Sequence, residues 1–305
     1  MKIKDSNSLF RPADQLNILF CAGLAMLVLL NATKIDEWPY LLLIYSSLIF
    51  FQIIICRLKN MNSLLRYTRD IIFPLVSILI CFDSLGLIVN KINPQDIDHI
   101  LIQLDYQLFG LHPTLYLQRY LTPVLSDMLQ AAYATYYFLP VALGVVLKIR
   151  KKNEDFNKSL FFVMLCFYLS YVGYIIWPAL GPRYAMPHLY ENDITGLLVS
   201  GPIQNILNLL EGVKRDAFPS GHTGIALTVL YLAYRYSHRL FWIILTPVIL
   251  LIIATVMCRY HYVVDVIGGL LLAVATVAAG ELYYTLIKNH ENTIQCNKRQ
   301  QTGIG

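Results

Sequence analysis

The chain has 305 residues, of which 57% are hydrophobic and only 14% are charged, with a mean hydropathy of +0.55. Because soluble domains carry about 25% charged residues, this composition argues against a soluble enzyme, a disordered chain and a nucleic-acid-binding protein. The six cysteines show no CxxC spacing, so the sequence predicts neither a zinc site nor a disulfide framework.

Eight apolar segments approach the roughly 20 mostly apolar residues that a membrane-spanning helix needs. In chain order they are residues 16–32, 38–56, 71–89, 128–147, 160–177, 221–236, 240–257 and 262–287, of which the first and the sixth are short. We therefore predict an all-α integral membrane protein with about eight transmembrane helices. The polar tail, residues 289–305, is expected to be disordered.

The basic residues favour one orientation in the membrane. With the N-terminus in the cytoplasm, 17 of the 24 Lys and Arg residues fall in cytoplasmic segments and 7 fall in segments on the opposite side. Positive charge accumulates on the cytoplasmic side, and eight spans return the chain to its starting side, so we predict that both termini are cytoplasmic. The two long outside connections, 90–127 and 178–220, carry Leu and Ile at helical spacing, which predicts helices on the membrane surface.

Basic residues on the outside gather beside three spans. Arg183 follows the fifth span, a Lys-Arg pair precedes the sixth, and Arg259 follows the seventh. Guanidinium groups bind phosphate oxygens through two parallel hydrogen bonds. The run Pro-Ser-Gly-His at 219–222 opens the sixth span, where the free N–H groups of a helix start attract an anion. The predicted phosphate-binding residues are Arg183, Ser220, Gly221, Arg259, Lys214 and Arg215.

Two histidines near these basic residues are the predicted catalytic groups. His261 and Asp265 are four residues apart on one face of the last span, so the carboxylate can accept one imidazole N–H and leave the other nitrogen free to attack. His222, on a different helix, is suited to act as the general acid. Only Asp216 and Asp265 lie near these motifs, too few carboxylates for a two-metal site, so we predict activity without metal or cofactor.

These motifs resemble a known family. Pro-Ser-Gly-His at 219–222 and His261-x-x-x-Asp265, on successive helices, are similar to the type 2 phosphatidic acid phosphatase superfamily, whose membrane enzymes cleave or transfer lipid phosphates through a phosphohistidine. The segments 105–110, 181–183 and 259–262 resemble the branch with the fungal inositol phosphorylceramide synthase, an inositolphosphotransferase. The resemblance implies a six-helix core over residues 71–288, preceded by two additional helices in residues 1–70 and followed by the cytoplasmic tail.

The resemblance also implies roles for single residues. His261 would be the nucleophile, Asp265 its orienting partner and His222 the acid, with Arg183, Ser220 and Gly221 binding phosphate. Two positions depart from the family pattern: Ile176 stands where a lysine is usual, and Thr255 stands where an arginine is usual. Arg259, Lys214 and Arg215 are the candidates to replace the missing charges.

Several functions stay open at this point. The expected substrate is a membrane lipid phosphate, and the motifs do not separate hydrolysis from transfer to an alcohol acceptor. A transporter would place ionisable groups near the bilayer midplane in repeated halves, but only Asp83 fits and no repeat is present. A catalytically inactive lipid-binding protein is disfavoured by the intact catalytic residues. Six tyrosines of the fourth and fifth spans are expected mainly to pack helices: Tyr133, Tyr136, Tyr137, Tyr168, Tyr171 and Tyr174.

Overall fold

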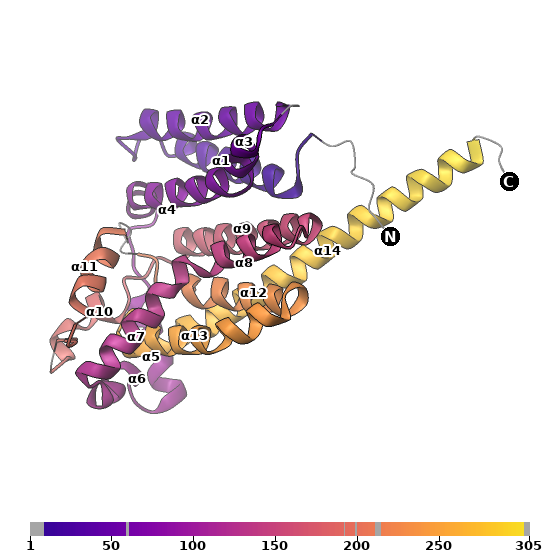
Figure 1. The fold of residues 1–305 in the computed structure, drawn as a ribbon. Coiled ribbons are helices and arrows are strands. Elements are labelled where there is room, and N and C mark those ends of the chain that lie inside the picture. Colours follow the sequence, from indigo (N-terminus) through magenta and orange to yellow (C-terminus); the bar gives the residue numbers. More distant parts are fainter. Residues whose placement is uncertain (1–8, 59–60, 192, 199, 211–214, 302–305) are drawn as a thin grey trace.

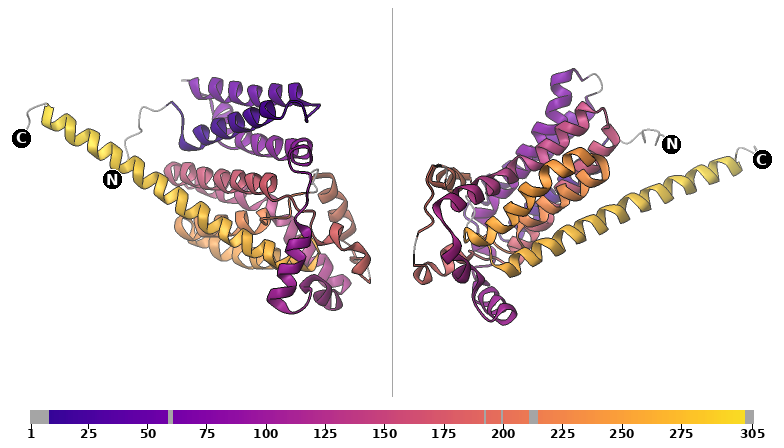
Figure 2. Two further views of the ribbon diagram at one scale, coloured as in Figure 1. Left: turned by 180° about the vertical axis from the view of Figure 1, so that it is seen from behind. Right: turned by 60° about the horizontal axis from the view of Figure 1, so that its bottom comes forward.

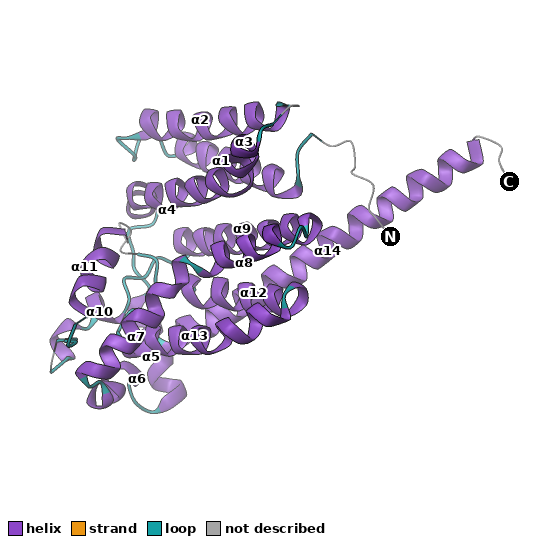
Figure 3. Cartoon of the chain, viewed as in Figure 1, coloured by secondary structure: helices purple, strands orange, loops and turns teal. Residues whose placement is uncertain are grey.

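Within the described part of the chain the protein is helical and has no β-strand, which confirms the all-α fold class (Figures 1 and 3). The computed structural model describes residues 9–58, 61–191, 193–198, 200–210 and 215–301. The α-helices are α1 (Pro12–Leu30), α2 (Trp38–Arg57), α3 (Ser63–Tyr67), α4 (Phe73–Ile92), α5 (Asp98–Phe109), α6 (Pro113–Leu117), α7 (Pro123–Ala134), α8 (Leu139–Ile149), α9 (Asn153–Ile176), α10 (Pro182–Ala185), α11 (Ser200–Leu210), α12 (Gly221–Tyr236), α13 (His238–Met257) and α14 (Val263–Gln301). Short helical turns adjoin them at η1 (Thr68–Ile72), η2 (Gln118–Tyr120), η3 (Thr135–Tyr137) and η4 (Pro187–Leu189).

Six helices of the described chain are long and apolar enough to cross a membrane, where the sequence predicts about eight. They are α1, α2, the continuous stretch Ser63–Ile92, α9, α13 and the Val263–Ile287 part of α14. The predicted fourth span is a bent pair, Pro123–Tyr137 and Leu139–Ile149, which would add a seventh as one broken span. The predicted sixth span is α12, which has only 16 residues.

A proline explains the break in the fourth span. The two halves meet at an angle of 52°, and Pro140 lies in the first turn of α8. Proline has no N–H group and therefore cannot complete the hydrogen-bond ladder across the junction. The bend directs α7 toward the end of the bundle where the shorter helices gather (Figure 1).

The first long helices form a layer on one side of α9 (Figures 1 and 2). The buried Asn17 side chain of α1 joins three helices: its amide donates to Gln52 of α2 at 2.9 Å, and its oxygen accepts from Ser77 of α4 at 2.7 Å. At the start of α1, Arg11 pairs with Asp70 of η1 at 2.7 Å. Satisfied polar contacts of this kind fix the register of packed helices.

The short helix α12 lies inside the bundle and packs against α9, α13 and α14. It begins after Ser220, whose hydroxyl accepts the Thr223 N–H at 3.3 Å as an N-cap. Gly269 brings α14 directly against this cap, because a Cβ at this position would lie only 2.5 Å from the Ser220 carbonyl oxygen. The starts of α12 and α14, which carry the predicted catalytic histidines, are therefore neighbours.

The remaining helices include one of the predicted surface helices and the C-terminal end of the chain. The first predicted surface helix is α5, which ends at Gly110 in the left-handed conformation with φ of 68°. The prediction of a disordered tail after residue 288 is wrong for most of its length, because α14 continues to Gln301 beyond the bundle (Figure 2). That stretch contains no Gly or Pro before Gln301, so nothing in it interrupts a helix.

Candidate active site

A tight turn between α13 and α14 places His261 inside the protein. The N–H groups of Tyr260 and His261 both donate to the Thr255 carbonyl, at 2.9 and 2.8 Å. Arg259 makes the turn possible by adopting a left-handed backbone conformation, with φ of 64°. The His261 side chain is consequently 4% exposed.

The hydrogen bonds of His261 define which nitrogen is free. Its Nδ1 lies 2.8 Å from the Ala217 carbonyl oxygen. Because a carbonyl only accepts hydrogen bonds, Nδ1 carries the proton and Nε2 holds the lone pair. Burial lowers the pKa of His261 to about 4, so the ring is neutral near pH 7 and Nε2 is available as a nucleophile.

Asp265 lies beside His261, as the four-residue spacing predicts. Its Oδ2 is 3.5 Å from Nδ1 of His261 and accepts the Tyr262 N–H at 2.8 Å. Its backbone carbonyl accepts the N–H of Ser220 at 3.0 Å, which connects the two motifs. The carbonyl of Ala217 is thus a closer partner of His261 than the carboxylate, and sequence reasoning missed it.

His222 faces His261 from the first turn of α12. Its Nδ1 lies 3.4 Å from Nε2 of His261 and 3.5 Å from the Tyr133 hydroxyl. Its Nε2 is buried and has no hydrogen-bond partner among the residues that the structure describes. The ring of Tyr133 stacks on it with the centroids 4.4 Å apart, and the ring of Tyr136 packs against it at a tilt of 42° with the centroids 4.2 Å apart. Two of the tyrosines expected mainly to pack helices therefore also hold a predicted catalytic side chain.

The predicted phosphate-binding groups at the start of α12 have close neighbours within the protein. Ser220 is fully buried, and its hydroxyl caps the helix through Thr223. A Cβ at Gly221 would lie 2.2 Å from the Tyr174 hydroxyl, so only glycine fits there without displacing this tyrosine. These contacts make both residues part of the local framework, and their binding of phosphate stays a prediction.

Arg183 and Arg259 are brought together by a backbone hydrogen bond, from the Arg183 N–H to the Arg259 carbonyl at 3.0 Å. The Arg183 guanidinium lies 5.0 Å from the centre of the Tyr260 ring, and the Arg259 guanidinium lies 3.9 Å from that of Tyr190. Aromatic faces attract such cations. The Tyr260 ring in turn stacks on Tyr133 at 4.2 Å, so Arg183 belongs to the same aromatic assembly as His222.

Arg259 is the more unusual of the two arginines. It is only 7% exposed, and burial lowers its pKa. Its Nε has no hydrogen-bond partner within the described part of the chain. A left-handed conformation at a residue other than glycine costs roughly 1–2 kcal/mol. Because glycine would adopt this left-handed conformation without that cost, an arginine here points to a role for its side chain.

The other predicted basic residues are not brought to the histidines by any described contact. Lys214 lies outside the described residues. Arg215 pairs with Asp96 at 3.1 Å and donates to the Asn93 carbonyl at 3.2 Å, which anchors the connection between α4 and α5. Asp83 lies exposed on α4.

The two positions that depart from the family pattern lie in different surroundings. Ile176, at the end of α9, is 49% exposed. Thr255 is buried in the last turns of α13, and its hydroxyl donates to the Ile252 carbonyl at 2.7 Å.

Two acidic residues of α5 hold the segments of the site in place. Asp98 accepts the N–H groups of Leu180 and Gly181, at 2.7 and 2.9 Å, and the Tyr262 hydroxyl at 2.8 Å. Asp105 accepts the N–H groups of Val263 and Val264, at 3.1 and 2.9 Å, and so caps α14. The sequence interpretation gave Asp98 no role and included Asp105 only in a resembling segment. Their seven-residue spacing on one helix face was the available signal.

The described residues contain no group of three or more His, Cys, Asp or Glu side chains arranged to hold a metal ion. Activity without metal remains a prediction that a chelator can test.

Comparison with known proteins gives two matches. The family model described as the PAP2 superfamily matches residues 99–279, which include both histidines, Asp265, Arg183 and Arg259 but not α1–α4. The PA-phosphatase related-family protein of Dictyostelium discoideum is 27% identical over 112 residues, which are 36% of this chain. The chain spans only 20% of the length of that relative. No solved structure matches the chain.

Proposed function

The chain belongs to the PAP2 superfamily, and on this premise we propose that it removes or transfers the phosphate group of a membrane lipid through a phosphohistidine at His261. The observation that carries the proposal is the pair of imidazoles, with Nε2 of His261 3.4 Å from Nδ1 of His222. One ring is fixed in the tautomer that a nucleophile needs, and the second stands next to the attacking nitrogen. The family and the apolar helices together support a membrane phosphatase.

The proposed reaction has two steps. In the first, Nε2 of His261 bonds to phosphorus, the bond from phosphorus to the lipid oxygen breaks, and that oxygen takes a proton from protonated His222. The negative charge of the bound phosphate stabilises the cation on this buried ring. In the second, the oxygen of water or of an alcohol bonds to phosphorus and gives its proton to His222. The N–P bond then breaks and returns the electron pair to His261.

The distance between the rings constrains how the substrate enters. A phosphoryl group does not fit between two nitrogens that are 3.4 Å apart. Displacement at phosphorus is in line, with Nε2 on one side of phosphorus and the leaving oxygen on the other. The two imidazoles must therefore move apart when the phosphate binds, which places the leaving oxygen next to His222. Arg183 and Arg259, from the two segments beside His261, are placed in our proposal as the groups that balance the charge on the phosphoryl oxygens. Arg215 is not placed in this clamp because it pairs with Asp96, and the phosphate-binding role of Lys214, which lies outside the described residues, stays a prediction.

Replacing Arg259 with glycine removes the guanidinium group while keeping the backbone conformation of the turn. Glycine adopts the left-handed conformation without strain, so we expect Arg259→Gly to fold with a melting temperature near that of the wild type. Loss of one charged donor should lower kcat by about 10²-fold. Thermal unfolding and turnover measured on the same preparation check this. A variant with full activity would remove Arg259 from the clamp.

We also propose that the site opens on the extracytoplasmic face and that both termini are cytoplasmic. The charge distribution supports this, as does the position of the basic turn between α8 and α9, at the opposite end of α9 from the histidines. Five native cysteines are buried, namely Cys21, Cys56, Cys81, Cys166 and Cys258. A labelling test therefore needs only Cys296 replaced by serine in the background. An impermeant thiol reagent should label Tyr184→Cys in intact cells and Glu154→Cys only after permeabilisation. The reverse pattern would invert the proposed topology.

The activity itself is tested with purified protein and a panel of lipid phosphates, with and without inositol as acceptor. We expect phosphate release or transfer that persists in EDTA, since the proposed steps use only imidazole and guanidinium groups. Product lipids and free phosphate, measured together, separate transfer from hydrolysis. The resemblance of segments 105–110, 181–183 and 259–262 favours transfer. Activity lost in EDTA and restored by Mg²⁺ would contradict the metal-free mechanism, and no turnover on any substrate would favour an inactive lipid-binding protein.

A further inference from the structure

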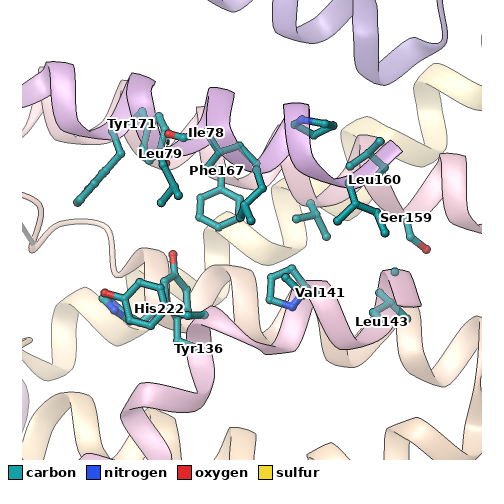
Figure 4. A pocket seen from close by; sticks show the side chains of 18 of the residues that line it. Ile78, Leu79, Tyr136, Val141, Leu143, Ser159, Leu160, Phe167, Tyr171 and His222 are labelled. Atoms are coloured by element: carbon teal, nitrogen blue, oxygen red, sulfur yellow. Dashed lines mark hydrogen bonds between the residues drawn. The ribbon is translucent and has the colours of Figure 1, made fainter. Parts of the chain in front are cut away.

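An apolar cavity of about 300 Å³ leads away from His222 into the bundle. His222, Asp216 and Tyr174 line one end, and Asp70, Phe156 and Ser159 line the other. Figure 4 shows the cavity between two rows of side chains, with Tyr171, Phe167 and Leu160 on one side and His222, Tyr136 and Val141 on the other. The cavity is therefore continuous with the proposed reaction site.

The cavity is long and narrow. Its lining extends along α9 from Phe156 to Tyr174, which corresponds to roughly 27 Å at about 1.5 Å per residue. A hydrocarbon core of about 30 Å has nearly the same thickness. A volume of about 300 Å³ spread over that length suits one linear chain better than a bulky ring system.

One wall of the cavity comes from a helix outside the family match. Ile78, Leu79 and Phe82 of α4 line the cavity, whereas the matched region begins at residue 99. The Tyr171 hydroxyl of α9 donates to the Ile78 carbonyl at 3.2 Å, which holds the two helices together along the cavity. The cavity therefore extends beyond the matched residues, which contain the proposed catalytic groups.

The end far from His222 is closed by charge. Asp70 pairs there with Lys148 and with Arg11, the latter at 2.7 Å. The Lys148 ammonium lies 4.1 Å from the centre of the Phe156 ring. Pushing an apolar chain past these groups would separate partly buried ion pairs, which is unfavourable. The ion pairs therefore mark the limit of the apolar space.

We propose that this cavity holds one linear apolar chain of the substrate, with the phosphate at the histidines, and that α4 and the Asp70–Lys148 pair set the chain length accepted. The inference rests on the proposed function, because it assigns the phosphate end of the ligand to His261 and His222. The substrate class is then a single-chain lipid phosphate, or a lipid phosphate of which one chain enters.

The test compares n-alkyl phosphates of increasing length, used as monomers below their micelle concentration. For the wild type, kcat/KM should rise about fourfold per methylene, equivalent to about 0.8 kcal/mol per buried CH₂, and then level off. Val163→Trp, which narrows the cavity part-way along α9, should reach its plateau at a shorter chain and lose at least tenfold on long chains relative to short ones, because Val163 is only 6% exposed and lines the cavity. Val172→Trp is the matched control, since Val172 is 40% exposed on the same helix and does not line the cavity.

The possible results distinguish failure of the chain-binding proposal from failure of the proposed function. Phosphate release by the wild type, with identical length profiles for wild type and Val163→Trp, would overturn the chain-binding proposal and leave the proposed function intact. Absence of phosphate release at every length would contradict the proposed function instead. If Val163→Trp fails to fold, an alkyl phosphonate with a terminal diazirine tests the wild type directly. We expect crosslinks near Phe156 and Ser159, and crosslinks confined to exposed residues such as Val172 would overturn the proposal.

Discussion

Replacing His261 with alanine should reduce turnover on the order of 10⁴-fold or more, the scale expected when a covalent nucleophile is lost. The substitution removes Nε2, the only protein atom that bonds to phosphorus in the proposed mechanism. It also removes the hydrogen bond to the Ala217 carbonyl, so thermal stability must be measured beside activity. Phosphate release from a lipid phosphate by purified protein, followed to low residual rates, is the measurement.

His238→Ala is the matched control for this experiment. His238 is exposed at the start of α13, where it stacks on Phe241 rather than facing the other histidines. The same change there should leave the rate within twofold of wild type. Near-normal turnover by folded His261→Ala protein would exclude His261 as the nucleophile.

Replacing Arg183 with alanine is expected to lower kcat by about 10²–10³-fold, as for the loss of one preorganised donor to a charged transition state. Charge builds on the phosphoryl oxygens during transfer, and a guanidinium fork can bind two of them at once. Arg183→Lys should recover only part of the loss, because an ammonium group cannot reproduce the planar fork. Steady-state kinetics of both variants on one lipid phosphate measure the effect.

Arg119→Ala provides the control for Arg183, since Arg119 is an exposed arginine that lies over the ring of Tyr116, 3.6 Å from its centre. Its loss should change kcat by less than twofold. Wild-type turnover in Arg183→Ala would assign the phosphate clamp to Arg259 and the start of α12, without Arg183.

The pairing of His222 with His261 could be predicted because it depends on a few local signals. The Pro-Ser-Gly-His run marks a helix start, and the four-residue spacing of His261 and Asp265 places both side chains on one face of the last span. Because successive spans cross the membrane in opposite directions, the two motifs are expected at the same end of the bundle. The structure brings the two nitrogens within 3.4 Å, which the sequence pattern suggested but could not measure.

Other parts of the site carry little or no sequence signal. The closest partner of His261 is the backbone carbonyl of Ala217, and every residue type has such a group. Asp98 and Asp105 read as charges on a surface helix, because hydropathy patterns do not reveal that they accept backbone N–H groups from distant loops. The 16-residue length of α12 also departs from the usual span length, because α12 is surrounded by other helices rather than by lipid.

The phosphohistidine is tested most directly by rapid acid-free quenching of the enzyme with a radiolabelled lipid phosphate, followed by peptide mapping. The account predicts an acid-labile, base-stable phosphoryl group on the peptide that contains His261, absent from His261→Ala and accumulating in His222→Ala supplied with a substrate that has a good leaving group. Label on any other residue, or full turnover by His261→Ala with no labelled intermediate, would contradict it.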